Sequence, residues 1–409
     1  MRLDWDRIIA ATRHAHTDAD APLCAYLYDL KALAHHAANL REGLSKHCDF
    51  FYAIKANSDL PLLITLAPQV DGFEASSGGE IAWLQQHFPG VPVIFSGPGK
   101  LDAELELALQ HGATVHVESL HELERLAALA RATGRSASLL LRVNPPLAEL
   151  TTTSLVMGGK PTQFGISIEH LPACLELLRQ EPALVLRGFH FHLLSHQLDA
   201  EKHLQLLAAY LRQARQWCAE YGLQIDHINV GGGIGVNYRE PQQQFDWPCF
   251  SAGLANLLAE EWKVEGEQNV PRLRFELGRF VSAFCGYYAT EVLDIKQAGD
   301  RAFAVVRGGT HHFRTPYAQG HSHPFRILPV EDWHRPYSRP EIRSRRVTVA
   351  GQLCTPKDVL ATDVPVDQLR VGDLLVFPYA GAYAWHISHH DFLRHPHPRH
   401  IYLPAEQQA

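Results

Sequence analysis

Lys55 directly follows strand-forming residues in the stretch FYAIKANSD, residues 51–59. Phe51, Tyr52 and Ile54 indicate a buried strand, and burying an ammonium group is costly unless the group is paired or loses its proton. Two interpretations are open. Lys55 is either a strand-end lysine whose apolar stem carries its charge to solvent, or a reactive amine.

Other side chains capable of chemistry follow the apolar segments between residues 30 and 280. Taken singly, each of these has a structural explanation. The glycines 231–233 can be only a turn, His190 and His192 can pack in a core, and Glu276 and Arg279 can form a structural ion pair. Their common position, each at the end of a predicted strand, nevertheless favours one shared site. These residues are Arg142, His190, His192, Ser195, Gly231, Gly232, Gly233, Glu276, Gly278 and Arg279.

This set of groups predicts a ligand. Backbone N–H groups of a glycine loop and an arginine suit a phosphate, and an amine that loses its proton suits Schiff-base chemistry. A carboxylate can keep a ring nitrogen protonated, and a flat imidazole can stack on an aromatic ring. Phosphate, aldehyde and pyridine together describe pyridoxal 5'-phosphate, which acts as an electron sink. We therefore expect this cofactor, and no metal, at the site.

The elements that must position these groups alternate between strands and helices. Stretches such as 77–88, 101–112 and 119–134 have helical patterns between the apolar segments. Eight strand-then-helix units predict an α/β fold built on a (β/α)8 barrel, whose active sites lie at the carboxyl ends of the strands. An open doubly wound sheet is the alternative. The predicted strands end near residues 55, 76, 96, 118, 142, 192, 231 and 276.

The pattern changes after about residue 280, where strands predominate. Residues 287–297, 301–309, 345–353 and 373–381 read as strands with no long helix between them. We expect a second, all-β domain of the sandwich or barrel type, formed by residues 281–409 together with 1–30, beside a barrel of residues 31–280. The strand-like stretch 21–30 would pair with the C-terminal sheet. The histidine- and proline-rich stretch 389–400 is expected to be a solvated tail rather than a metal site.

Composition excludes several classes of protein. The chain has 409 residues, of which 46% are hydrophobic and 20% charged, and a formal net charge of -7. This charge gives no electrostatic basis for binding nucleic acid or an anionic membrane. The sequence has neither a signal-peptide pattern nor a run of apolar residues long enough to cross a bilayer. Seven scattered cysteines without a CxxC pair suit a reducing compartment, so we expect a cytoplasmic protein.

The motifs together resemble the fold-type III pyridoxal-phosphate-dependent decarboxylases, the superfamily of diaminopimelate and eukaryotic-type ornithine decarboxylases. The resemblance covers nearly the whole chain. YAIKAN is similar to the strand that carries the Schiff-base lysine, FHFHLLSHQ to the histidine-containing sixth strand, and NVGGGIG to the phosphate loop. FELGR resembles a Glu-Pro-Gly-Arg segment, with Leu277 where proline is usual.

The resemblance implies a role for each matching residue. Lys55 would form the Schiff base, His192 would stack on the ring, Glu276 would face its nitrogen, and Ser195, Gly278, Arg279 and Tyr383 would contact the phosphate. GQLCTPKD resembles the segment whose cysteine, here Cys354, enters the active site of the partner subunit. The family therefore implies a homodimer with shared active sites, in which Cys354 is our candidate acid for protonating Cα.

The substrate-binding segments depart from the familiar enzymes. Diaminopimelate decarboxylases have Glu and ornithine decarboxylases Asp directly after this cysteine, whereas Thr355 stands here; Asp358 fits a later aspartate of the diaminopimelate pattern. The stretch 307–326 holds His311, His312 and Arg314 among several further His and Arg residues. Such donors favour a polycarboxylate substrate, although an exposed basic loop would look the same.

This stretch, with SGPGK, CTPKDVLATD and GAYAWHISHHDF, resembles the siderophore-biosynthesis decarboxylases of the staphyloferrin B type. We therefore expect decarboxylation of a citrate-conjugated 2,3-diaminopropionate to a citryl-ethylenediamine. A diaminopimelate or basic amino-acid decarboxylase is the main alternative. A racemase fits less well because the decarboxylase-like Cys354 segment is present. A pyridoxal-phosphate carrier or regulatory protein on the same barrel would usually lack the β domain.

Overall fold

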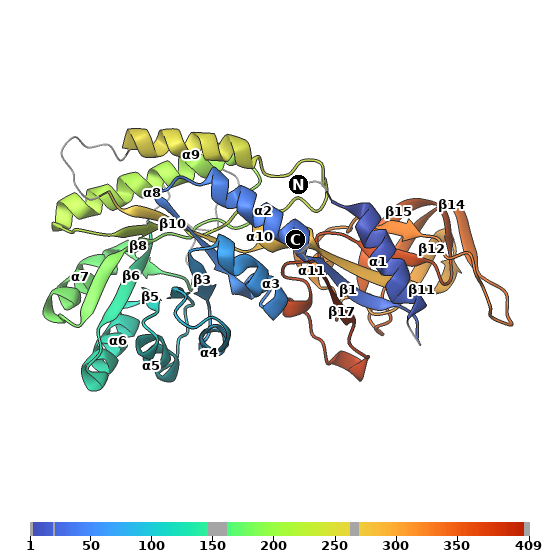
Figure 1. The fold of residues 1–409 in the computed structure, drawn as a ribbon, viewed down its shortest axis with the longest axis horizontal. Helices are drawn as coiled ribbons and strands as arrows, with labels where there is room; N and C mark the ends of the chain where they lie inside the picture. The colour runs from blue at the N-terminus through green and yellow to red at the C-terminus, as the bar shows by residue number, and fades with distance from the viewer. Residues whose placement is uncertain (1–2, 19–20, 146–161, 262–269, 405–409) are drawn as a thin grey trace, which may run out of the picture.

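The computed structural model describes residues 3–18, 21–145, 162–261 and 270–404. Two sheets organise these residues, and each forms the centre of one part of the molecule. Figure 1 shows the parallel sheet with its helices on one side and the second sheet on the other, joined where α2 (Leu30–Gly43) and α10 (Arg279–Ser282) lie. The sequence prediction of an α/β barrel with a second sheet domain is confirmed.

The first sheet is a closed parallel barrel. Its strands pair in the order β5-β4-β3-β2-β10-β9-β8-β6, and the further pairing of β5 with β6 closes the ring. Eight barrel strands are found in the described residues, each ending at or within a few residues of a predicted point. They are β2 (Cys48–Ala53), β3 (Gly72–Ala75), β4 (Val93–Phe95), β5 (Thr114–Val117), β6 (Ala137–Asn144), β8 (Leu184–His190), β9 (His227–Asn229) and β10 (Arg272–Leu277). The two-residue strand β7 (Ile166–Ser167) pairs in parallel with the last two residues of β6.

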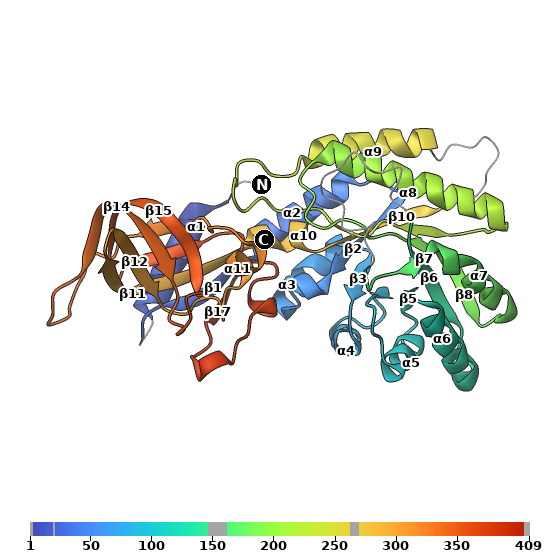
Figure 2. The ribbon, with the colours of Figure 1, turned by 180° about the vertical axis from the view of Figure 1, so that it is seen from behind.

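Helices connect these strands along the outside of the barrel, as Figure 2 shows from behind. Local sequence defines their ends: Ser77 and Ser119 accept N-cap hydrogen bonds, and Gly134 and Gly222 end helices in the left-handed conformation. The helices are α3 (Leu60–Leu66), α4 (Gly78–His87), α5 (Asp102–Gln110), α6 (Leu120–Thr133), α7 (Leu171–Gln180), α8 (Ala200–Tyr221) and α9 (Trp247–Glu261).

The second sheet combines the C-terminal strands with one strand from the start of the chain. β1 (Cys24–Asp29) pairs antiparallel with β11 (Gly286–Ala298) and parallel with β17 (Arg399–Leu403). The expected pairing of the stretch 21–30 with this sheet is therefore confirmed. The remaining strands are β12 (Arg301–Val306), β13 (Arg326–Leu328), β14 (Glu341–Ala350), β15 (Val359–Arg370) and β16 (Leu374–Phe377).

Two features of this part differ from the sequence prediction. An unpredicted helix, α1 (Trp5–Thr17), is capped by Asp4 and packs Ile8 and Ala15 against the face of the sheet. The stretch 389–400 is not simply a solvated tail, because its last two residues begin β17 and bring the ring of His400 against Tyr26. The domain also contains the short helix α11 (Thr315–Gln319). None of the described helices has the length and apolar character needed to cross a membrane.

Gly188 provides a test of barrel closure. It adopts φ +152° in β8, and an added Cβ would lie 1.8 Å from the carbonyl oxygen of His227 on β9. We expect Gly188→Ala to destabilise the protein by about 2 kcal/mol or more, because the two strands cannot separate without losing their pairing. Gly222→Ala is the matched control: its φ is +64° but nothing lies within 4 Å, so about 1 kcal/mol is expected. Thermal unfolding followed by circular dichroism would show the difference, and equal losses would contradict it.

Candidate active site

A cavity of about 640 Å³ opens at the carboxyl ends of the barrel strands. Apolar and polar side chains from the barrel line it, together with Tyr383 from the C-terminal part of the chain. Gly231 and Gly232 lie beside it, against His192 and Glu276. The sequence-predicted residues that line the cavity are Lys55, Arg142, His190, His192, Ser195, Gly233, Glu276, Gly278, Arg279 and Tyr383.

Lys55 lies in the single 3-10 turn Ile54–Ala56 that follows β2, with 43% of its side chain exposed. Its Nζ donates to the carboxylate of Glu74 at 2.9 Å and to Ser76 Oγ at 3.3 Å. Burial favours the neutral amine, but Glu74, Tyr383 and Glu276 outweigh it and raise the pKa of Lys55. The amine is therefore protonated in the free protein, and Glu74 is placed to take part in removing its proton.

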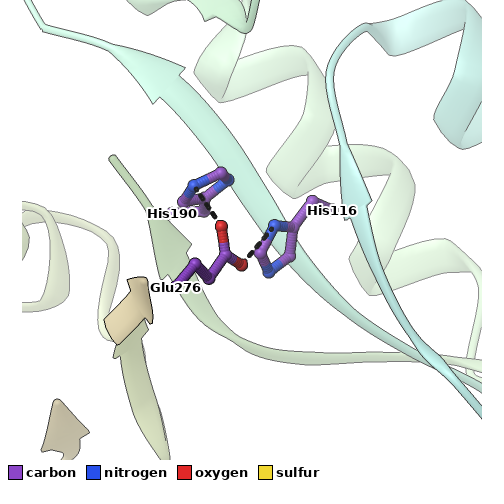
Figure 3. Close-up of side chains that lie close together, drawn as sticks. All are labelled: His116, His190 and Glu276. Carbon is purple, nitrogen blue, oxygen red and sulfur yellow. Dashed lines mark ion pairs between the residues drawn. The ribbon is translucent and has the colours of Figure 1, made fainter. Parts of the chain in front are cut away.

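Glu276 ends β10 inside the barrel and is nearly buried. Asn229 donates to Oε1 of Glu276 at 2.8 Å, and ring nitrogens of His116 and His190 lie 3.5 and 3.7 Å from its two oxygens (Figure 3). Burial, with the charge of Glu74 in second place, raises the pKa of Glu276 to about 8, against the opposing effects of Lys55 and Asn229. This carboxylate therefore has a high affinity for a proton.

The ligand atoms of His116, His190 and Glu276 lie within 4.8 Å of one another, which is also a spacing for a metal ion. The Asn229 amide donates to Glu276 and faces His116 Nε2 at 3.3 Å, so a metal would have to displace it. The geometry favours a hydrogen-bonded set.

The glycine loop after β9 approaches its neighbours too closely for any side chain. A Cβ on Gly231 would lie 2.3 Å from His192 Nδ1, and one on Gly232 would lie 2.1 Å from the carbonyl oxygen of Glu276. The Gly232 N–H donates to His192 Nδ1 at 3.4 Å. Burial, followed by Arg142, lowers the pKa of His192 to about 3, so this ring is neutral. The loop thus packs against a flat imidazole that lines the cavity, and Gly233 is the glycine of the loop that lines it as well.

Arg279 begins α10 at the cavity wall. Its guanidinium donates to Tyr238 Oη at 2.8 Å and lies 4.5 Å from the centre of the Tyr383 ring. Among the described residues, Arg279 has tyrosine contacts but no carboxylate partner, so its charge is available to an anion. Arg142 differs, because it is paired with Glu118 at 2.9 Å.

These groups fit pyridoxal 5'-phosphate. A cradle of glycines that a Cβ would fill, with the cation of Arg279 beside it, suits the phosphate. An accessible amine suits the aldehyde, and a buried carboxylate of high proton affinity suits a ring nitrogen.

The remaining predicted residues do not line this cavity. Cys354 is exposed and Thr355 is partly exposed in the loop between β14 and β15, while His311 and His312 are buried in the second domain. The carboxylate of Asp358 accepts hydrogen bonds from the N–H and hydroxyl of Thr310 and from the N–H of Leu353. Both oxygens of Asp358 are therefore used by the protein itself, and a substrate contact would have to share them.

Arg314 also lies outside the cavity lining. Its guanidinium is 3.1 Å from His389 Nδ1, and the protein gives it no carboxylate partner in its described part. In one chain, then, the groups for binding the cofactor lie together and the predicted substrate residues lie elsewhere.

Sequence reasoning missed three polar residues of the site: Glu74, His116 and Asn229. Glu74 lies in the predicted strand-end segment GFEASS and His116 in VHVES, so a test for every ionisable residue within two positions of a strand end would have found both. Asn229 immediately precedes VGGG, and only its contacts reveal its importance.

Comparisons with known proteins give a consistent result. The model of the family "Pyridoxal-dependent decarboxylase, pyridoxal binding domain" matches residues 30–283. The 2-[(L-alanin-3-ylcarbamoyl)methyl]-2-hydroxybutanedioate decarboxylase of Staphylococcus aureus is 44% identical over 95% of this chain and 96% of its own length. The diaminopimelate decarboxylase of Bacteroides thetaiotaomicron is 29% identical over 88% of this chain and 90% of its own. The crystal structure of Helicobacter pylori diaminopimelate decarboxylase with L-lysine superposes with a TM-score of 0.81 at 26% identity, covering 96% and 94% of the two chains.

The pair of Lys55 and Glu74 predicts a pH dependence for attachment of the cofactor. Because Glu74 raises the pKa of Lys55, Glu74→Gln should increase the neutral fraction of the amine at a given pH. The rate at which the cofactor-free protein forms its visible absorbance band with pyridoxal 5'-phosphate should then rise at a pH about one to three units lower than in the wild type. Glu124→Gln, an exposed carboxylate on α6, is the control. An unchanged profile for Glu74→Gln would contradict this role.

Proposed function

Because this chain belongs to the pyridoxal-dependent decarboxylase family, we propose that it decarboxylates a citrate-conjugated 2,3-diaminopropionate to a citryl-ethylenediamine, in the biosynthesis of a carboxylate siderophore. One observation carries the substrate: the 44% identity to the Staphylococcus aureus enzyme extends over both parts of the chain. The name of that enzyme describes an amide between a hydroxy-tricarboxylate and the side-chain nitrogen of an L-amino acid. We further propose a cytoplasmic location, which the scattered cysteines favour.

Each residue at the cavity has a proposed part in holding the cofactor. Lys55 would hold the aldehyde, His192 would lie against the ring and Glu276 would face the ring nitrogen. Gly233, where the glycine loop lines the cavity, would contact the phosphate together with Arg279. Additional contacts from Arg142, Ser195, Gly278 and Tyr383 are proposed from their position in the cavity lining.

When bound, pyridoxal 5'-phosphate accepts the electron pair that remains when carbon dioxide leaves the α-carbon. The protein supplies protons and orientation. Glu74 lies within hydrogen-bond distance of Lys55 Nζ and can hold the proton that the amine gives up. Glu276 would accept a hydrogen bond from the protonated ring nitrogen and so hold that proton in place. After carbon dioxide has left, an acid must deliver a proton to the α-carbon, and we assign this step to the Cys354 thiol.

This assignment requires a second subunit. Cys354 is exposed and absent from the cavity of its own chain, so it must reach the cavity of another chain if it is to act. We propose a homodimer with shared active sites, in which Cys354 and Thr355 enter the partner's cavity. Asp358 supports this arrangement indirectly: by binding Thr310 and Leu353 it fixes the loop that presents Cys354.

A cationic subsite for the citryl group is proposed at Arg314, which also lies on the second domain. Arg314 contributes an uncompensated charge, since its hydrogen-bond partner His389 accepts from it and is neutral at physiological pH. His311 and His312 shortly precede Arg314 in the chain and are fully buried, and burial lowers their pKa values to about 4 and 2. They would therefore act as neutral hydrogen-bonding groups, with Arg314 as the anion-binding residue.

Diaminopimelate decarboxylation is the second candidate, favoured by the close similarity of fold to the Helicobacter pylori enzyme. The absence of an acidic residue at Thr355, where a distal ammonium group would need one, argues against it.

Release of carbon dioxide separates the two candidates. Protein loaded with pyridoxal 5'-phosphate is incubated in parallel with citryl-diaminopropionate, meso-diaminopimelate, ornithine and lysine. We expect release from the citryl substrate only, because Arg314 favours carboxylates and the chain lacks an acid at 355. Arg314→Gln should weaken use of the citryl substrate at least tenfold, mainly through KM, because it removes a charge-assisted contact. Release from diaminopimelate alone would replace the first candidate with the second.

Complementation tests the shared site. Lys55→Ala disables the cavity of its own chain, and Cys354→Ala disables the residue that a chain supplies to its partner's cavity. A mixed dimer of the two variants should therefore have one intact site out of two. Random pairing should restore about a quarter of the wild-type activity. Lys55→Ala with Glu276→Ala is the control, since both residues lie at the same cavity and no mixed dimer has an intact site. Equal activity of the two mixtures would contradict sharing.

A further inference from the structure

The carboxylate of Glu276 accepts a hydrogen bond from Asn229, and the uncharged rings of His116 and His190 lie beside its two oxygens (Figure 3 shows the two rings); we call these three residues the neutral bracket. Asn229 comes from β9, His116 from β5 and His190 from β8, so the barrel itself brings them around the end of β10. All three are almost completely buried. Nothing in the proposed chemistry so far uses them.

The orientation of the Asn229 amide is fixed by its partners. Its Oδ1 accepts from the N–H of Gly231 at 2.8 Å, which leaves Nδ2 to face Glu276. Nδ2 donates to Glu276 Oε1 at 2.8 Å and lies 3.3 Å from His116 Nε2. One amide therefore connects the glycine loop to the carboxylate, so the proposed phosphate site and the proposed ring-nitrogen site are positioned by the same side chain.

The state of His116 follows from this contact. Because Asn229 presents an N–H to Nε2, that nitrogen is an acceptor and the ring proton lies on Nδ1. Nδ1 then donates to Ser96 Oγ at 3.0 Å and lies near Glu276. Neither nitrogen of His190 has a hydrogen-bond partner among the described residues. Burial is the main cause that lowers the pKa of His116 and of His190 well below the usual value, so both rings are uncharged.

The cations around the bracket all have other carboxylates as partners. Four such pairs, with N–O distances from 2.7 to 3.2 Å, are formed by the described residues. They are Lys55 with Glu74, Lys100 with Glu122, Arg142 with Glu118, and Arg274 with Asp49. These cations are thus paired with other carboxylates, and the polar groups nearest to Glu276 are the uncharged side chains of the bracket.

Neutral donors have a specific advantage opposite a ring nitrogen. A carboxylate and a protonated ring nitrogen attract each other, but in a buried site the proton can also move to the carboxylate and leave both groups neutral. Hydrogen bonds to the carboxylate favour the charged arrangement. A cation in the same place would stabilise the carboxylate but would also repel the protonated ring. Uncharged donors stabilise the carboxylate without repelling the protonated ring.

We propose that Asn229 and His116 are positioning residues that keep Glu276 ionised and oriented, so that the ring nitrogen of the bound cofactor stays protonated. This inference rests on the proposed placing of the ring nitrogen against Glu276. It assigns the bracket to the electron-accepting power of the cofactor, with His190 completing its uncharged wall.

Binding of two cofactors distinguishes this role from a structural one. Cofactor-free protein is titrated with pyridoxal 5'-phosphate and with its analogue in which carbon replaces the ring nitrogen, and the ratio of the two dissociation constants is measured. The wild type should prefer the natural cofactor by roughly ten- to a hundredfold, the value of a charge-assisted hydrogen bond. In His116→Leu and in Asn229→Leu this preference should fall about tenfold, and His116→Gln, which retains a donor and an acceptor, should recover most of it.

His203→Leu is the matched control, because His203 is also a buried histidine and its nitrogens have no hydrogen-bond partners among the described residues. It should retain the full preference. The ratio cancels any general loss of stability, since both compounds bind the same folded protein, and Asn229→Leu provides the measurement if His116→Leu does not fold. A wild-type preference that persists in both leucine variants would overturn this proposal alone. A wild type with no preference would overturn the placing of Glu276 against the ring nitrogen as well.

Discussion

Buried charged groups at the mouth of a closed barrel must be paired or solvated by polar neighbours, and the rest of the site depends on this constraint. The barrel brings the carboxyl ends of eight described strands to one edge, so residues as distant in sequence as Lys55 and Glu276 share one cavity. Lys55 and Arg142 are each matched with a carboxylate. Glu276 accepts a hydrogen bond from uncharged Asn229 and has only the uncharged rings of His116 and His190 as its other close partners among the described residues, which leaves its carboxyl group available to a bound ligand.

The second domain completes this arrangement from outside the barrel. Tyr383 donates its N–H to the carbonyl of Ala56 at 2.8 Å, and Asn57 donates to the carbonyl of Gly381 at 3.1 Å. Both bonds lie at the C-terminal end of the 3-10 turn that carries Lys55, so the segment that follows β16 fixes this turn. The same segment places the Tyr383 ring beside Arg279. Residues 381–383 are therefore part of the site even though they lie outside the barrel.

Much of this arrangement was predictable because it depends on local patterns. Strand ends follow from apolar runs that stop at polar or glycine residues, and these placed Lys55, His192 and Glu276 correctly at one edge of one sheet. The helix α1 was missed because its apolar positions are few and only the sheet gives them a partner. The bracket around Glu276 was missed for a deeper reason. Asn229 and His116 act through contacts between strands, and nothing in either local segment specifies those contacts.

The division of the site between two kinds of residue has a consequence for specificity. The cavity of one chain contains the residues proposed to hold the cofactor, and the residues proposed to contact the substrate, such as Arg314 and Thr355, lie on the second domain. Changes there leave the paired charges of the barrel undisturbed, because no described ion pair joins Arg314 to the barrel. A fold shared with diaminopimelate decarboxylase at a TM-score of 0.81 is therefore compatible with a different substrate. Selection on the second domain can change the side chain that is accepted while the barrel continues to remove the same carboxylate.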